Sequence, residues 1–205
     1  MSFISYLYTC AVAFYLLGEL LRGFESVHLQ RNLGLIRDTW RHHILDQIIV
    51  RFQTSTGLEQ TRLIPVDEQA INLELRDIAE IDLLPLIWCK KLEKITLRHN
   101  LLSQIDLTPL SKCPSLEVVY LGHNKISQID LEPLSDCSHL REVDMAHNLL
   151  SSVDISPLFH CSELKDLMID KDVTLTADLL LRSIGSWPDV LVDRFHRILW
   201  KSTGI

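Results

Sequence analysis

The sequence of 205 residues lacks the short motifs that mark many enzymes and cofactor-binding proteins. It contains no glycine-rich phosphate loop, no serine nucleophile elbow and no paired cysteine or histidine motif with zinc spacing. It also lacks an excess of positive charge, because its net charge is −7, and the total gives no support for a nucleic-acid partner. We therefore expect a protein that is not an enzyme, uses no cofactor and binds no nucleic acid.

A phrase of 24 residues recurs through the middle of the chain. Its second half carries Ile-Asp-Leu-x-Pro-Leu, or a close variant, followed by a cysteine. The leucines that open the copies are Leu92, Leu116, Leu140 and Leu164. A fixed period of this size predicts a solenoid, in which each unit buries its apolar side by stacking on its neighbours. A degenerate opening unit starts near Glu68, and acidic residues outnumber basic ones over the repeats.

The first half of each unit has the spacing LxxIxLxxN or a close variant. In the first full copy these positions are Leu92, Ile95, Leu97 and Asn100. Ile95 and Leu97 alternate with polar residues, as in a strand with one buried face. The whole period resembles a leucine-rich repeat. The resemblance implies an α/β fold, a right-handed solenoid with a parallel concave sheet, and a protein that binds other proteins and seldom catalyses.

The second half of each unit predicts the convex side of the solenoid. Pro109 and its equivalents stand where a short helix or 3₁₀ turn begins, with Thr108 and Ser156 placed as N-caps. An aspartate precedes each proline by three residues, which fits capping of the turn, with a cation between stacked carboxylates as the alternative. These aspartates are Asp82, Asp106, Asp130 and Asp154.

Four cysteines recur with the same period. They are Cys89, Cys113, Cys137 and Cys161. Each occupies an apolar position at the end of the convex turn, where a thiol serves as a small hydrophobic group. We expect buried free thiols and hence a reducing, cytoplasmic setting, with a disulfide between stacked neighbours as the alternative.

The sequence divides into four segments. They are an apolar helix over 1–22, a flanking region over 23–67, the leucine-rich repeats over 68–172 and a helical C-terminal cap over 173–205. In the flanking region, apolar spacings near three and four predict an amphipathic helix up to Phe52, although Ile48–Phe52 also fits a strand. In the cap, similar spacings predict one helix over 174–184 and a second over 187–200, which together close the solenoid.

The run Phe3–Leu21 is nearly all apolar, and Glu19 is its only charge. As a helix it has a length of about 28 Å, close to the thickness of a bilayer core. No lysine or arginine precedes it, which argues against a secretory signal peptide. Several arginines follow it, so a membrane-spanning run leaves the repeats on the cytoplasmic side. Two interpretations stay open: a membrane anchor, and a buried helix that covers the first edge of the solenoid.

The strand residues that point away from the core form the expected binding face. They are Lys94, Thr96, Arg98, Val118, Tyr120, Glu142, Asp144, Asp166, Met168 and Asp170. They place a basic patch at the start of the face, an aromatic centre at Tyr120 and an acidic end. This composition is typical of a hot spot with a polar rim. We expect a protein partner whose basic segment is attracted to the acidic end.

Three histidines, His99, His123 and His147, directly precede the repeated asparagines. Imidazoles in neighbouring units lie close together, which makes a metal site conceivable. A ladder with strand spacing nevertheless separates its first and last members by about 10 Å. Ligands of one ion must converge on a point, so we expect no metal here.

Overall fold

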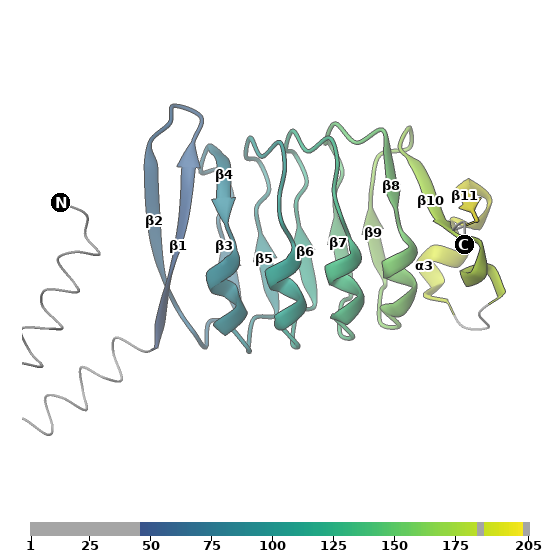
Figure 1. Ribbon diagram of the computed structural model, residues 1–205, viewed down its shortest axis with the longest axis horizontal. Helices are drawn as coiled ribbons and strands as arrows, with labels where there is room; N and C mark the ends of the chain where they lie inside the picture. The colour runs from purple at the N-terminus through teal and green to yellow at the C-terminus, as the bar shows by residue number, and fades with distance from the viewer. Residues whose placement is uncertain (1–45, 184–186, 203–205) are drawn as a thin grey trace, which may run out of the picture. The chain divides into compact units, whose positions relative to one another are not determined.

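The computed structural model describes residues 46–183 and 187–202. The run Phe3–Leu21 and most of the helix predicted before Phe52 lie outside these residues. Within them, no helix is both long enough and apolar enough to cross a membrane. From residue 46 onward, short strands and single helical turns recur coil after coil along one axis (Figure 1).

A five-stranded parallel sheet takes one strand from each coil. The strands are β3 (Ala70–Asn72), β5 (Lys94–Thr96), β6 (Val118–Tyr120), β7 (Glu142–Asp144) and β9 (Asp166–Met168). Their order in the sheet follows the sequence, β3-β5-β6-β7-β9. Residues one period apart are partners, as Ile71 is with Ile95 and Ile95 with Val119. The predicted stack of parallel strands in register is confirmed.

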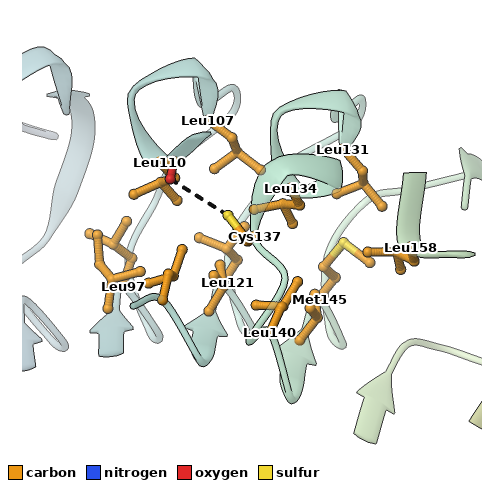
Figure 2. Packing of buried hydrophobic residues seen from close by; sticks show 14 of the residues in the cluster. Leu97, Leu107, Leu110, Leu121, Leu131, Leu134, Cys137, Leu140, Met145 and Leu158 are labelled. Atoms are coloured by element: carbon orange, nitrogen blue, oxygen red, sulfur yellow. Dashed lines mark hydrogen bonds between the residues drawn. The ribbon is translucent and has the colours of Figure 1, made fainter. Parts of the chain in front are cut away.

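One continuous apolar core runs through the coils. The opening leucines Leu92, Leu116 and Leu140 have no exposed surface. Figure 2 shows Leu97, Leu121 and Met145, which are equivalent residues of three successive coils, packed beneath the convex turns. Each coil therefore buries its leucines against both of its neighbours, so that stability depends on the contacts between coils.

Single 3₁₀ turns form the convex side, as the repeated prolines predicted. They are η2 (Leu84–Trp88), η3 (Thr108–Lys112), η4 (Glu132–Asp136) and η5 (Ser156–His160). The predicted N-caps are wrong, because Thr108 and Ser156 are the first residues inside their turns and the preceding residues make no side-chain cap bond. The repeated aspartates cap instead: the Asp106 Oδ1 atom accepts the Thr108 N–H at 2.8 Å, and the three equivalents accept at 2.9 Å. The aspartates' predicted role in capping is confirmed.

The repeated asparagines turn into the core and satisfy the bend after each strand. Asn124 is 7% exposed, and its Oδ1 atom accepts the Leu102 N–H at 3.1 Å. Its Nδ2 group donates to the carbonyl oxygens of Leu97 and Leu121, both at 2.9 Å. A buried polar side chain is tolerated here because it gives partners to main-chain groups that water does not reach.

The four repeated cysteines are buried and free, as predicted. The Cys137 thiol points to the Leu110 carbonyl oxygen of the preceding coil at 3.6 Å (Figure 2). Cys113 and Cys161 make the same contact, at 3.4 and 3.3 Å. Burial is the largest cause that raises the pKa of Cys137 to about 12. A thiol with this pKa stays protonated at neutral pH and is a poor nucleophile.

A β-hairpin precedes the first coil. Its strands β1 (Gln47–Thr54) and β2 (Glu59–Pro65) pair in antiparallel fashion, and β1 also pairs with β4 (Ile78–Asp82). The predicted helix is therefore wrong from Ile48 to Phe52, and the strand alternative is correct there. Ile48, Val50 and Phe52 alternate into the core, which is the spacing of a strand with one buried face.

The C-terminal segment also differs from the prediction. Over 174–200 the expected helices are replaced by β10 (Thr174–Asp178), η6 (Leu179–Ser183), the single turn α3 (Asp189–Val192), η7 (Phe195–Arg197) and β11 (Ile198–Lys201). The strand β10 pairs in parallel with β11 and with β8 (Ser152–Asp154). The β-branched Thr174 and Thr176 favour a strand. The free edge of β8 then provides hydrogen-bond partners for the main chain of β10. In a helix these main-chain groups would pair with one another.

Candidate binding surface on the five-stranded sheet

The ten predicted contact residues all lie on β5, β6, β7 and β9 or directly after these strands. We call the side of the sheet that faces away from the core the open sheet face. Eight of the ten side chains are exposed or half-buried there. Thr96 and Asp144 are 5% and 4% exposed. Because they are buried, these two side chains present little surface to a partner.

Arg98 links three strands of the open sheet face. Its guanidinium lies 3.8 Å from the centroid of the Tyr120 ring, and its Nε atom donates to the Asp144 Oδ2 atom at 2.6 Å. One end of the guanidinium reaches the Met168 sulfur at 3.9 Å. The Asp144 Oδ1 atom accepts the Ala146 N–H at 3.0 Å. The buried carboxylate is thus paired and hydrogen-bonded, and it fixes the arginine over the tyrosine.

Gly122 makes room for this pair. A Cβ atom on Gly122 would lie 2.5 Å from the Asp144 Oδ2 atom, so any side chain here would displace the carboxylate. The equivalent positions in the neighbouring coils hold Arg98 and Ala146. The repeat spacing alone assigns Gly122 no role. The signal was present, because a glycine between two residues with side chains leaves a notch in a face that the repeats otherwise fill.

Tyr120 lies at the centre of the face and is held on several sides. Its hydroxyl group bonds to the Glu142 carboxylate. The Lys94 Nζ atom lies 4.6 Å from the ring centroid. The hydrogen bond to Glu142, followed by burial, raises the pKa of Tyr120 to about 12, so the phenol remains a donor at neutral pH. The aromatic centre is therefore ordered before any partner arrives.

The acidic end consists of Glu142, Asp166 and Asp170. Asp166 is exposed, and the other two are half-buried. The Asp170 Oδ2 atom accepts the His147 N–H at 2.7 Å. Arg194 lies close enough to Asp166 to interact with it electrostatically, and it donates to the Leu167 carbonyl oxygen at 2.6 Å. The end of the sheet thus carries three carboxylates, and the two arginines beside them, Arg194 and Arg197, both donate to main-chain carbonyl oxygens.

The three histidines form a stack at the margin of the sheet. The ring centroids of His99 and His123 are 4.1 Å apart, and those of His123 and His147 are 4.2 Å apart. All three residues have positive φ angles, between 55° and 58°. Stacked rings turn their faces to one another, so their nitrogen atoms do not converge. Among the described residues, no group of three or more histidine, cysteine or acidic side chains is placed to hold a metal ion.

The family model described as leucine rich repeat matches residues 90–150. No curated protein matches the sequence. Among solved structures, internalin C2 from Listeria monocytogenes is 24% identical, with 64% of this chain and 51% of the internalin covered and a TM-score of 0.44. The LRR ectodomain of the receptor kinase SOBIR1 from Arabidopsis thaliana is 20% identical, with 77% and 80% covered and a TM-score of 0.47.

The plant peptide hormone receptor RGFR1, solved in complex with RGF2, is 22% identical to this chain. The similarity covers 54% of this chain and 16% of the receptor, with a TM-score of 0.41. This chain thus spans about half of internalin C2 and a small part of RGFR1. The matched residues 90–150 carry the same 24-residue unit that stacks in register from β3 to β9. Residues 90–150 are thus leucine-rich repeats.

Proposed function

We propose that this protein is a non-catalytic interaction module that binds a segment of a partner protein on the open sheet face. Tyr120 is the central contact, and a basic part of the partner lies against Asp166 and Asp170. The observation that carries the proposal is the fixed arrangement of Arg98 on Tyr120, held from beneath by the buried Asp144.

The fixed arrangement lowers the cost of binding. A side chain that becomes immobilised in an interface loses about 0.5–1.5 kcal/mol of conformational entropy. Arg98, Tyr120 and Glu142 are already ordered by their contacts with one another, so a partner avoids most of this cost. The half-buried Val118 extends the apolar centre, and charged groups surround it as a rim.

The charges on the face favour a basic segment. Asp144 is already neutralised by Arg98, so the attraction comes from Glu142, Asp166 and Asp170. Carboxylates on a rim act mainly on the rate of association and on its salt dependence. A partner with lysines or arginines beside an apolar contact therefore fits this face better than an acidic one.

The test is quantitative affinity capture with the intact chain and matched variants. Tyr120→Ala removes the centre, and Asp166→Lys with Asp170→Lys reverses the acidic end. Glu132→Lys with Asp136→Lys is the control, because it makes the same charge change on exposed positions of η4. We expect the control variant to bind the partner as well as the intact chain does. Tyr120→Ala should lower the affinity at least tenfold. Asp166→Lys with Asp170→Lys should also lower it, by an amount that decreases as the salt concentration rises. Equal capture by all variants would refute the proposal.

A second proposal concerns the place where the module works. The apolar run Phe3–Leu21 and the arginines after it support a membrane-tethered scaffold with the repeats facing the cytoplasm. The four buried thiols fit a reducing compartment in either case. Fractionation of cells that express the chain with and without residues 1–22 tests the tether. Deletion should release the chain from membranes, whereas an unchanged distribution contradicts the anchor.

A further inference from the structure

The outward positions of the 3₁₀ turns differ from coil to coil, although the inward positions repeat. In η2 these positions hold Leu84, Ile87 and Trp88. The same positions hold Thr108, Ser111 and Lys112 in η3, Glu132, Ser135 and Asp136 in η4, and Ser156, Phe159 and His160 in η5. The coils stack in the same way whatever these side chains are, so stacking does not explain the three apolar residues of η2.

Among the outward positions of η3, η4 and η5, the single apolar residue is Phe159, and it has a structural explanation. Phe159 is 8% exposed, because the C-terminal segment covers it with Trp187 and Trp200, whose rings lie 5.2 and 6.0 Å away. No described residue covers the η2 turn in this way. Leu84 is 61% exposed and Trp88 is 65% exposed. The exposed tryptophan and leucine form a contiguous apolar surface, and such surfaces mark sites where ligands or partners bind.

These residues line a shallow groove between η2 and η3. Its volume is about 470 Å³, and its floor consists of Leu84, Ile87, Trp88 and the ring of Pro109. This volume is within the range of sites that hold a small ligand or one large side chain. The Trp88 indole N–H makes no hydrogen bond to a described residue and is available as a donor. The groove therefore has an apolar floor with a polar group at its edge.

Two lysines border the groove. Both Lys90 and Lys112 are exposed, and the Lys90 Nζ atom donates to the Lys112 carbonyl oxygen at 2.8 Å, which holds the amine at the rim. Neither forms an ion pair with a described residue. The acidic side chain at the groove is Asp106, and one of its oxygen atoms accepts the Thr108 N–H. The rim therefore offers two cations that a partner's carboxylates can pair with.

We propose that this groove docks a protein segment in which a large apolar side chain lies next to one or two carboxylates. The apolar side chain packs between Trp88 and Pro109, and the carboxylates pair with Lys90 and Lys112. The chemistry of this partner is opposite to that expected on the open sheet face, and the proposal does not depend on the function assigned to that face. The solenoid then connects an acidic segment on its turns to a basic segment on its sheet.

The experiment selects 12-residue peptides from a random phage-displayed library on the immobilised full chain. Enriched peptides are synthesised with a fluorophore, and their affinity is measured by anisotropy. Trp88→Ala removes the floor, and Lys90→Glu with Lys112→Glu reverses the rim. The matched control is Lys125→Glu with Lys165→Glu, since both lysines are exposed and neither lines the groove. Tyr120→Ala separates this site from the open sheet face.

We expect enriched peptides that carry Phe, Leu or Trp within three positions of Asp or Glu. Their affinity should fall at least tenfold with Trp88→Ala and with the rim variant, and it should not change with Tyr120→Ala or the control. Trp88 is exposed, so its removal should leave the thermal unfolding of the chain unchanged. Thermal melts followed by circular dichroism check this point.

Three outcomes overturn the proposal. The first is enrichment of basic peptides, or of peptides without acidic residues, at this groove. The second is peptide binding that Trp88→Ala leaves unchanged. The third is self-association of the chain in sedimentation experiments that Trp88→Ala abolishes, because the occupant is then a second copy of the same chain.

Discussion

The Arg98–Asp144 pair predicts an asymmetry that unfolding experiments can measure. The Asp144 side chain is 5% exposed, whereas that of Arg98 is 27% exposed. If Asp144 is removed, the arginine can turn towards water and recover part of its solvation. If Arg98 is removed, the carboxylate stays in its notch without a cation. Arg98→Ala should therefore destabilise the protein more than Asp144→Ala.

The magnitudes follow from the contacts. Asp144→Ala loses a charge-assisted hydrogen bond and the acceptor of the Ala146 N–H, and together these cost about 2–4 kcal/mol. Arg98→Ala leaves a buried, unpaired carboxylate, which costs about 3–5 kcal/mol. The double variant removes both charges, so its loss should be smaller than the sum of the two single losses.

The assay is urea unfolding at pH 7, followed by circular dichroism and analysed by linear extrapolation. Arg141→Ala is the control, because Arg141 pairs with Glu117 and Glu163 in an exposed position, and its loss should have a much smaller effect. Equal losses of stability for Asp144→Ala and Arg98→Ala, or additive losses in the double variant, would contradict the predicted asymmetry.

Three further predictions concern residues that repeat from coil to coil: the asparagines, the histidines and the cysteines. Asn124→Ala should cost about 2–4 kcal/mol in urea unfolding, because three buried main-chain groups lose their partner, while the exposed Asn72→Ala should cost far less. Burial and the neighbouring imidazoles lower the pKa of His123 below its ordinary 6.5, so the unfolded chain takes up the proton first. The stability that His123 contributes is therefore present above pH 6.5 and is lost as the pH falls through its folded pKa. His123→Gln should reduce the change of the urea midpoint between pH 7.5 and 5. In a Cys10→Ser variant, a thiol reagent at pH 8 should react slowly with the native chain and should titrate all four remaining thiols, Cys137 included, after unfolding; fewer than four would contradict free thiols.

The repeating part of the fold is readable from the sequence because one spacing fixes several structural features at once. A constant period forces the strands of successive coils into register, as the pairing of Ile95 with Val119 shows. The same period places every aspartate of the Asp106 series where its carboxylate meets the turn. Each prediction of this kind is repeated several times along the chain, so that local ambiguity averages out.

The ends of the solenoid are harder to predict because nothing repeats there. Leu175 and Leu179 have helical spacing, but Leu175 lies in β10, and Leu179 begins the turn after it. The edge of β8 favours a strand at Leu175, because its main-chain groups have no partner until a parallel strand pairs with them. An amphipathic pattern also predicted a helix up to Phe52, where the structure has β1. In both segments a tertiary contact outweighs the local spacing.

The burial of Asp144 shows a second limit. Alternation along a strand gives the side of the sheet on which a residue lies, and on this point the sequence is correct. It does not show that Arg98, two strands away, reaches past Gly122 and pairs with the carboxylate. Long side chains cross several strands of a flat sheet, so the exposure of a residue depends on residues that are one or two periods distant.

The departures from the repeat therefore carry more functional information than the repeat itself. Stability comes from the inward residues, which are nearly the same in every coil, and these residues leave the outward positions free to vary. Gly122 and Tyr120 mark the open sheet face in one coil, and Trp88 marks the groove in an earlier one. Because the two surfaces share no side chain, a variant of one should leave binding at the other unchanged.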